Sequence, residues 1–582
     1  MTTPFSQDEL TETLLAAKRT GNFFSVLLGE APREAEARTE FCEVLAAIHN
    51  TNTIDLVAEF AEFRNGAVGA DFFLTRHLFQ TALPYLDAPT ASVVSTVAHL
   101  VTQAGQDMAS NWPLEQFHSF LTKAPERPKE ALRTIEEYPG SLAFLLPVVA
   151  TAGFRSQRDY FTEQLLLLSK SPLEELQRQA VFSLGEAPWR ENYGEVPPQV
   201  VNQLESLVAG TESDGLLAAS VSAVLALLAK DQASSDRYHE IIRAALAIGG
   251  QWTLGAVAQA YAFKQDTLAP AFLTLLTNYL KANVTQNAQV LQWVDFGVSS
   301  RLHSTNRNEA LEILEEVLRR FPGSIEIKNF GCCESSIDSS PQLRSFIVTR
   351  WLASGEATLC DAAGDLVQRS HRDDVTIDAD RDALATVDEA ALAFVAIKAV
   401  GYLFFSHMPA ASFLISLMRI GAIEPIKELL LDSLLINYPG SLRTFVEARI
   451  TSEPEPVAAA LRDCLAQLDR YLKNIETAMG IKELRASAEQ RATFHKTLTQ
   501  KLSKSFEAAQ KEMPLLSLVK RSIVLYGRGS VQRVVHADGT THRADMMFKT
   551  QGTEFSFPRM SHIDELGLHL QLRIFRVGKR NQ

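Results

Sequence analysis

Cysteine is scarce in this chain, and what there is does not form a recognisable site. The 582 residues contain five cysteines, an odd number, and none is spaced as Cys-x-x-Cys. The chain also lacks an apolar run at its N-terminus, so we expect a reducing, cytoplasmic compartment without disulfides. Cys332 and Cys333 are adjacent but have no third ligand at zinc spacing, which favours small buried residues, and no metal is expected.

Long apolar runs are lacking as well. The most apolar stretch, residues 391–418, is interrupted by Lys398, His407 and Pro409. A membrane-spanning helix needs about 18 or more consecutive apolar residues. We therefore interpret the stretch as two helices of the protein core and expect no membrane insertion.

Catalytic and nucleotide-binding motifs are also missing. His371-Arg372-Asp373 lacks the asparagine that follows in a kinase catalytic loop, and Gly527-Arg528-Gly529-Ser530 does not precede a predicted helix. The sequence therefore predicts a non-enzymatic protein without a cofactor. An unfamiliar enzymatic or metal site is the alternative, and it would be sought at His536 and His542, which flank one predicted turn; a surface histidine pair is the simpler interpretation.

One acidic segment has the spacing of a calcium loop. Asp378, Asp380, Asp382 and Glu389 occupy positions 1, 3, 5 and 12 of an EF-hand pattern. The pattern requires glycine at position 6, where this chain has Ala383. An acidic first turn that leads into a helix over 382–402 explains the same residues, so cation binding by Asp378–Glu389 is left open.

Helical patterns are what the sequence has in abundance, and residues 171–189 give the clearest one. Ser171-Pro172 is a helix start, and Gly185 and Pro188 are stop signals. Between them, apolar residues recur at helical spacing on one face. These residues are Leu173, Leu176, Ala180, Val181 and Leu184.

This helix resembles the second helix of a HEAT repeat. The resemblance rests on the order Leu176, Gln177, Ala180, Ser183, Leu184, Gly185, with Gln177 where the family prefers arginine. It implies an α-solenoid of helical hairpins, whose extended surface would bind other proteins. An ordinary amphipathic helix in a globular all-α domain is the alternative.

The rest of residues 1–452 continues the helical rhythm. Apolar periodic segments follow one another with short polar connections, as in an array of helical hairpins. An aromatic-Pro-Gly-Ser corner occurs at 138–142, 321–325 and 438–442, each time after an amphipathic segment. At each corner we expect the aromatic residue to pack inward, glycine to take positive φ and serine to cap the next helix. The separations leave room for repeats of about 40 residues but prove no fixed period.

The C-terminal part has a different character. After the boundary at 453–456, residues 455–513 read as a long helical hairpin, and residues 516–582 as a small basic module of four or five antiparallel strands. The turn Asp538-Gly539 indicates one β-hairpin. Leu568, Leu570, Leu572 and Ile574 alternate strictly with polar residues, which is typical of a strand. We thus expect a mainly α protein: a solenoid over 1–452, the hairpin, and the β module.

Charge divides the chain unevenly. The net charge is −13, yet residues 470–582 hold 20 Lys and Arg against 10 Asp and Glu, so an acidic body carries a basic C-terminal region. This region predicts an acidic partner or contact with the chain's own body. The candidate binding residues are Arg491, Lys496, Lys501, Lys504, Arg528, Arg533, Arg543, Arg573 and Arg576.

Two functions fit these patterns. The first is a scaffold or adaptor that is part of a complex and binds protein partners through the helical-repeat surface and the basic C-terminal module. The second is a nucleic-acid-associated protein that contacts phosphates through the basic region alone, because the acidic body would repel them. Residues 455–582 could also form an oligomer.

Overall fold

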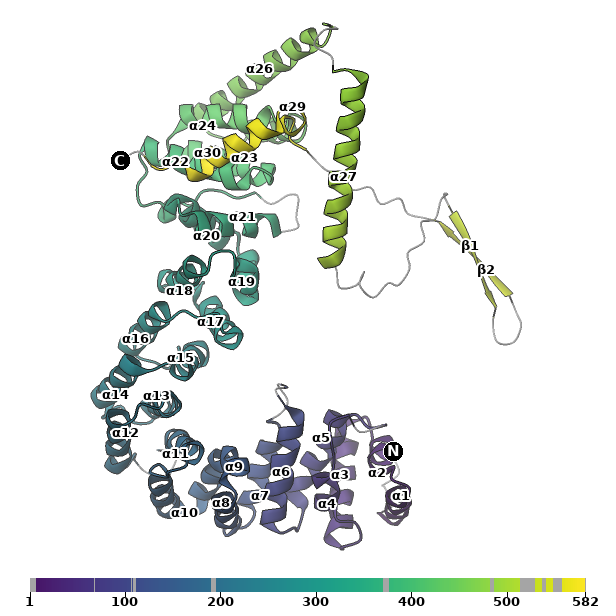
Figure 1. The fold of residues 1–582 in the computed structure, drawn as a ribbon, viewed down its shortest axis with the longest axis vertical. Helices are drawn as coiled ribbons and strands as arrows, with labels where there is room; N and C mark the ends of the chain where they lie inside the picture. Colours follow the sequence, from purple (N-terminus) through teal and green to yellow (C-terminus); the bar gives the residue numbers. More distant parts are fainter. Residues whose placement is uncertain are drawn as a thin grey trace. The chain divides into compact units, whose positions relative to one another are not determined.

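The computed structural model describes residues 7–66, 69–105, 107, 111–189, 195–369, 376–481, 486–512, 529–535, 541–547 and 557–580. The chain forms two compact units, residues 1–336 and 337–582. Packed helices dominate both units, in agreement with a helical-repeat, α-solenoid architecture (Figure 1). The predicted domain boundaries at 452–455 and 513–516 stay predictions.

The first unit consists of consecutive helices with short connections. Its helices are α1 (Gln7–Arg19), α2 (Phe23–Glu30), α3 (Ala35–Asn50), α4 (Leu56–Ala61), α5 (Phe72–Ala82), α6 (Thr90–Ala104), α7 (Pro113–Thr122), α8 (Arg127–Glu137), α9 (Pro139–Leu142), α10 (Leu146–Leu168), α11 (Glu174–Glu186), α12 (Pro198–Gly210), α13 (Asp214–Leu228), α14 (Ser235–Ile248), α15 (Gln251–Phe263), α16 (Pro270–Ala282), α17 (Ala288–Arg301) and α18 (Arg307–Arg320). Helix α19 (Gly331–Ser339) begins in this unit, which ends at residue 336.

From α11 onward these helices form two rows. Helices α11, α13, α15 and α17, the odd row, pack side by side, and α12, α14, α16 and α18, the even row, do the same (Figure 1). Because α13 touches both of its row neighbours and both α12 and α14, it is apolar almost all round, and its sequence DGLLAASVSAVLALL follows from that position.

Carboxylates link helices of successive helical pairs in the first unit. Asp214, the first residue of α13, accepts hydrogen bonds at the start of α15 from the amides of Gly250 (2.6 Å), Trp252 (2.6 Å) and Thr253 (3.1 Å). These amides are the free donors that every helix start leaves. Asp295 of α17 accepts in the same way from the amides of Cys332 and Cys333 at the start of α19. The linked residues are 36–39 positions apart in the sequence, which is the length of one helical pair.

Helix α11 differs from its prediction at both ends. It begins at Glu174, and the Ser171 hydroxyl accepts from the Leu173 amide before the helix starts. Gly185 lies within the last turn, where an added Cβ would stand 2.3 Å from the Cα of Ala223 in α13. The glycine is therefore required for close approach of two helices and does not serve as the stop signal.

The three aromatic-Pro-Gly-Ser corners each follow the end of a helical segment but are otherwise built differently. Tyr438 is buried as expected, whereas Tyr138 is 56% exposed, so the prediction of inward packing is wrong there. Only Gly323 of the three glycines has positive φ, at 73°. Ser441 contacts His407 through its hydroxyl instead of capping a helix. The motif thus ends a helix, whereas tertiary packing determines whether the aromatic residue is buried and which contacts the glycine and serine make.

The second unit begins with α20 (Pro341–Ser354) and α21 (Ala357–Arg369). It continues with α22 (Glu389–Leu403), α23 (His407–Ile420), α24 (Ile423–Leu429), a π-helical turn over Leu430–Leu435, α25 (Ser441–Ile450), α26 (Glu455–Ala478), α27 (Ala488–Glu512), α29 (Met560–Ile563) and α30 (Glu565–Val577). The apolar stretch 391–418 falls in α22 and α23, two buried helices that pack on each other. No helix in the described part of the chain has the length and apolar character to cross a membrane.

The predicted C-terminal β module is wrong. The alternating residues 568–574 belong to helix α30, in which Leu568 and Leu572 are buried and Leu570 and Ile574 are exposed. Apolar residues two positions apart lie on opposite faces of a strand, but they also fit a helix that has two apolar faces. Here the segment is a helix, and it packs against α22. The described residues contain only one antiparallel strand pair, β1 (Gly529–Val535) with β2 (Thr541–Met547). The predicted turn Asp538-Gly539 lies outside them.

Candidate binding groove

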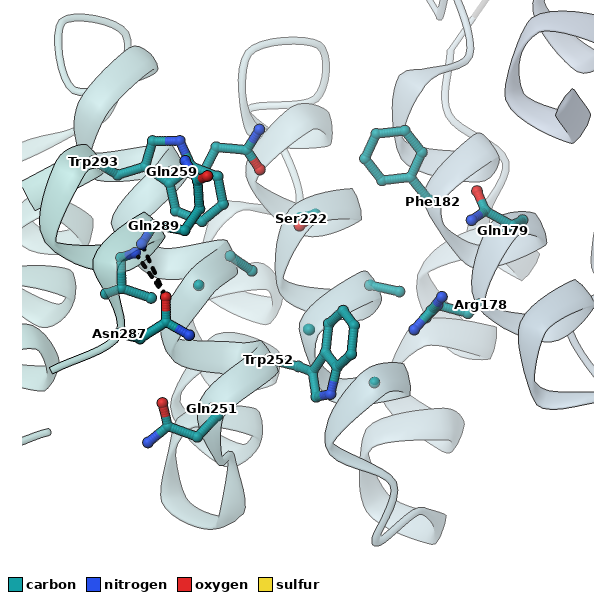
Figure 2. Close-up of a pocket in the computed structure, with 16 residues that line it drawn as sticks. Arg178, Gln179, Phe182, Ser222, Gln251, Trp252, Gln259, Asn287, Gln289 and Trp293 are labelled. Carbon is teal, nitrogen blue, oxygen red and sulfur yellow. Dashed lines mark hydrogen bonds between the residues drawn. The ribbon is translucent and has the colours of Figure 1, made fainter. Parts of the chain in front are cut away.

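A groove of about 710 Å³ runs along the odd row (Figure 2). Four consecutive helices of this row supply its lining, with one short stretch of side chains from each. The lining residues are Arg178, Gln179 and Phe182 of α11; Gly215, Ala218, Ala219 and Ser222 of α13; Gln251, Trp252, Gly255, Ala256 and Gln259 of α15; and Asn287, Gln289, Val290 and Trp293 at α17.

The groove exists because α13 presents very small side chains on this face. Gly215, Ala218, Ala219 and Ser222 recur at spacings of three and four, so they share one side of the helix. The neighbouring helices add larger side chains, among them Phe182 of α11 and Trp252 of α15, although α15 also contributes the small residues Gly255 and Ala256. Small residues between larger ones leave a hollow whose floor is helix backbone and methyl groups.

Aromatic rings form the walls. Trp252 is 65% exposed, and the Arg178 guanidinium carbon lies 5.2 Å from the centre of its ring (Figure 2). Arg178 also pairs with Glu175 one turn earlier, so its charge is balanced within α11. Beyond the groove, the exposed rings of Phe263 and Phe296 lie 5.3 Å apart on α15 and α17. Exposed apolar surface of this extent is typical of an interaction site.

Neutral amides supply the polar part of the lining. Asn287 uses its side-chain oxygen to cap α17, accepting from the amides of Gln289 (3.0 Å) and Val290 (3.3 Å; Figure 2). Gln179, Gln251 and Gln259 add further amide groups. Arg178 is the only charged residue among the sixteen that line the groove, and none of them is Asp, Glu, His, Cys or Lys. The groove is therefore suited to recognition through hydrogen bonds and ring contacts.

The basic candidates within the described residues lie on α27, on the β1–β2 pair and on α30. Arg491, Lys496 and Lys504 are exposed on α27, which also contains Lys501. Arg533 and Arg543 are register partners in the β1–β2 pair. Arg528 lies outside the described residues, as does His536.

The two candidates on α30 have different surroundings. Arg573 is exposed. Arg576 donates through Nε to the carbonyl of Gly401 at 2.7 Å and lies over the ring of Tyr402, so it holds α30 against α22. These basic residues stay predictions as binding residues.

Three carboxylates of the acidic segment have partners within the protein. Asp378 pairs with Arg419 at 3.1 Å, and Asp380 accepts from the Asp382 amide. Asp388 accepts from the Ala391 amide at the start of α22 and pairs with Arg580, and these contacts lower the pKa of its carboxyl. No group of three or more potential metal-ligating side chains occurs in the described ranges. The expected helix over 382–402 begins only at Glu389.

Sequence reasoning missed the groove. The helix that contains Arg178 and Phe182 was recognised, but the groove is built from four helices spread over more than one hundred residues. One signal in the sequence could have indicated it: the small residues of α13 are followed by two helical segments that contain Trp252 and Trp293. Comparison with models of protein families and with curated proteins finds no match for this chain.

Proposed function

We propose that this protein is a non-enzymatic, HEAT-like scaffold of the cytoplasm that holds an extended segment of a partner protein in the groove of the odd row. The supporting observation is the groove itself: small residues on its floor, tryptophan and phenylalanine on its walls, and neutral amides between them. The repeat separation of 36–39 residues supports the HEAT-like assignment.

The geometry favours an extended peptide over a folded surface. Neighbouring helices pack about 8–10 Å apart, and an extended chain rises about 3.3 Å per residue, so roughly nine residues would cross the four helices. The floor of α13 lets the peptide backbone approach closely. Gln179, Gln251 and Gln259 can then bond to its amides and carbonyls, while Trp252 and Trp293 receive apolar side chains.

A display selection tests this function. Random twelve-residue peptides displayed on phage are selected on the full chain, and we expect enriched peptides with apolar residues at regular spacing. Ala218→Arg places a long charged side chain on the groove floor and should abolish their binding. Ala244→Arg, at an exposed alanine of α14 in the even row, is the matched control and should bind normally. Failure to enrich peptides, or equal binding by both variants, would overturn the proposal.

The basic C-terminal region is the second part of the proposed scaffold. Arg491, Lys496 and Lys504 are exposed on one helix, as a docking surface for an acidic partner requires. If the partner is a nucleic acid instead, binding should fall steeply with salt, because released counterions dominate such affinities. Replacing the three residues by alanine and measuring binding to a fluorescent oligonucleotide at two salt concentrations separates the two partners.

A further inference from the structure

Helix α30 has two apolar faces, one made of buried residues and the other of exposed residues. Leu568 and Leu572 are 2% and 3% exposed and face α22. Leu566, Leu570, Ile574 and Val577 are 81%, 58%, 55% and 67% exposed. At about 100° per residue, the last four fall on one stripe, on the side away from the two buried leucines. We call these four residues the outer stripe.

The outer stripe belongs to a helix that is fixed in place. Lys398, which is itself buried, donates from Nζ to the Arg576 carbonyl at 2.5 Å. Arg580 pairs with Asp388 at 2.9 Å, and the Met560 amide donates to the Asn437 side chain just before α30. Both ends of α30 are therefore held, and the stripe is presented as a rigid ridge.

We propose that the outer stripe is the contact surface between two copies of this chain, with α30 of one copy antiparallel to α30 of the other. A twofold axis at Leu570 places Leu570 opposite its own copy and Leu566 opposite the partner copy's Ile574. The stripe matches itself because Leu566 and Ile574 are each four residues from Leu570. Such self-complementarity is what an interface between identical subunits requires.

Charge supports the antiparallel direction. The first turn of α30 contains the exposed Glu565, and the exposed Arg573 lies one residue before its last turn. An antiparallel pair brings the acidic end of one helix near the basic end of the other, and it also aligns the two helix dipoles favourably. A parallel pair would bring like charges together.

The size of the surface sets the strength of the dimer. Thirteen helical residues span about 20 Å, and two such helices in contact bury on the order of 1,000 Å² in total, near the lower limit of specific interfaces. We therefore expect a reversible dimer that dissociates on dilution. This proposal is independent of the groove on the odd row.

Sedimentation velocity of the full chain over a hundredfold concentration range tests the dimer. The mass should rise from 64.3 kDa toward twice that value as the concentration increases. Leu570→Arg places two arginines face to face on the axis. The variant should associate at least tenfold more weakly and stay monomeric over this concentration range. Leu167→Arg, at a leucine 62% exposed on α10, is the matched control and should dimerise normally. A chain that stays monomeric throughout, or a Leu570→Arg dimer, overturns the proposal.

Cross-linking tests the antiparallel geometry. In a Cys332→Ser background, which removes the one exposed thiol, Leu570→Cys should be joined to its copy by a short bis-maleimide. Leu566→Cys should not, because two copies of this residue lie eight residues, about 12 Å, apart along the pair. The combination of Leu566→Cys chains with Ile574→Cys chains should cross-link again. Efficient joining of Leu566→Cys to itself would indicate a parallel pair and contradict the proposal.

Discussion

The guanidinium of Arg178 on α11 lies over the indole ring of Trp252 on α15, 5.2 Å from the ring centre, across the small side chains of α13. This contact joins two helices that are not neighbours in the row. Trp252 nevertheless stays 65% exposed.

Trp252→Ala should weaken the binding of a selected peptide by tenfold or more, because an exposed aromatic anchor carries much of such a contact. The free energy of unfolding should change by less than about 0.5 kcal/mol, as for most surface positions. Fluorescence anisotropy of a labelled peptide and urea denaturation measure the two effects. Trp112→Ala, at a tryptophan 62% exposed on another part of the first unit, is the control. Equal losses of affinity in both variants would contradict the prediction.

Gly185→Ala should destabilise the first unit by about 1–3 kcal/mol, as overpacking of a tight contact does. The added methyl group would stand 2.3 Å from the Cα of Ala223, so α11 and α13 must separate. Gly210→Ala is the control, since an added Cβ there meets nothing within 4 Å. Urea denaturation of both variants should show a lower midpoint for the first one only.

Asp214→Asn should make stability less dependent on acid pH. Burial acts to raise the pKa of Asp214, but hydrogen bonds from Thr253, Gly250 and Trp252 outweigh it and lower the pKa below its ordinary value. A carboxyl with a lowered folded-state pKa contributes stability above its unfolded pKa, and this contribution is lost as the pH falls through the folded-state pKa. The variant should lose about 1–2 kcal/mol near neutral pH. Urea denaturation at a series of pH values from 7 to 3 measures the loss of stability at neutral pH and its dependence on pH. Asp8→Asn, at an exposed residue of α1, is the control and should show the same pH dependence as the unaltered chain.

Gly401→Val should release α30 from α22. An added Cβ at Gly401 already comes within 3.2 Å of the backbone nitrogen of Arg576, and branched methyl groups would fill the space of that contact. Amide hydrogen exchange across 565–577 should then become at least tenfold faster. Gly440→Ala in the same unit, where nothing lies within 4 Å of the added Cβ, should leave the exchange unchanged. Unchanged protection in Gly401→Val would show that this contact does not hold the helix.

The helical nature of the chain could be predicted from the sequence because amphipathic period and short polar connections are local properties. Residues 391–418 are the clearest case, with α22 and α23 found where two core helices were expected. The strand predicted at 568–574 was wrong because alternation of leucine does not distinguish a strand from a helix covered on two sides. That distinction depends on α22, which lies far away in the sequence.

The candidate groove could not be predicted for a related reason. Ala218 and Ser222 are ordinary small residues in the sequence, and their size matters only because Phe182 and Trp252 lie beside them in the structure. Which residues become neighbours depends on how the repeats stack. The repeat length is visible in hydrogen bonds between repeats, such as the one that the Gly250 amide donates to Asp214. Such bonds leave no periodic pattern in hydrophobicity.

The links through Asp214 and Asp295 have a direction. In each link the carboxylate precedes its amide partners in the chain by 36–39 residues. The residue with the carboxylate is therefore synthesised before the helix whose amides it accepts from. When α15 leaves the ribosome, the group that caps its first turn is already in place on α13. At these two junctions, a finished helix can thus serve as the template that starts a helix made later.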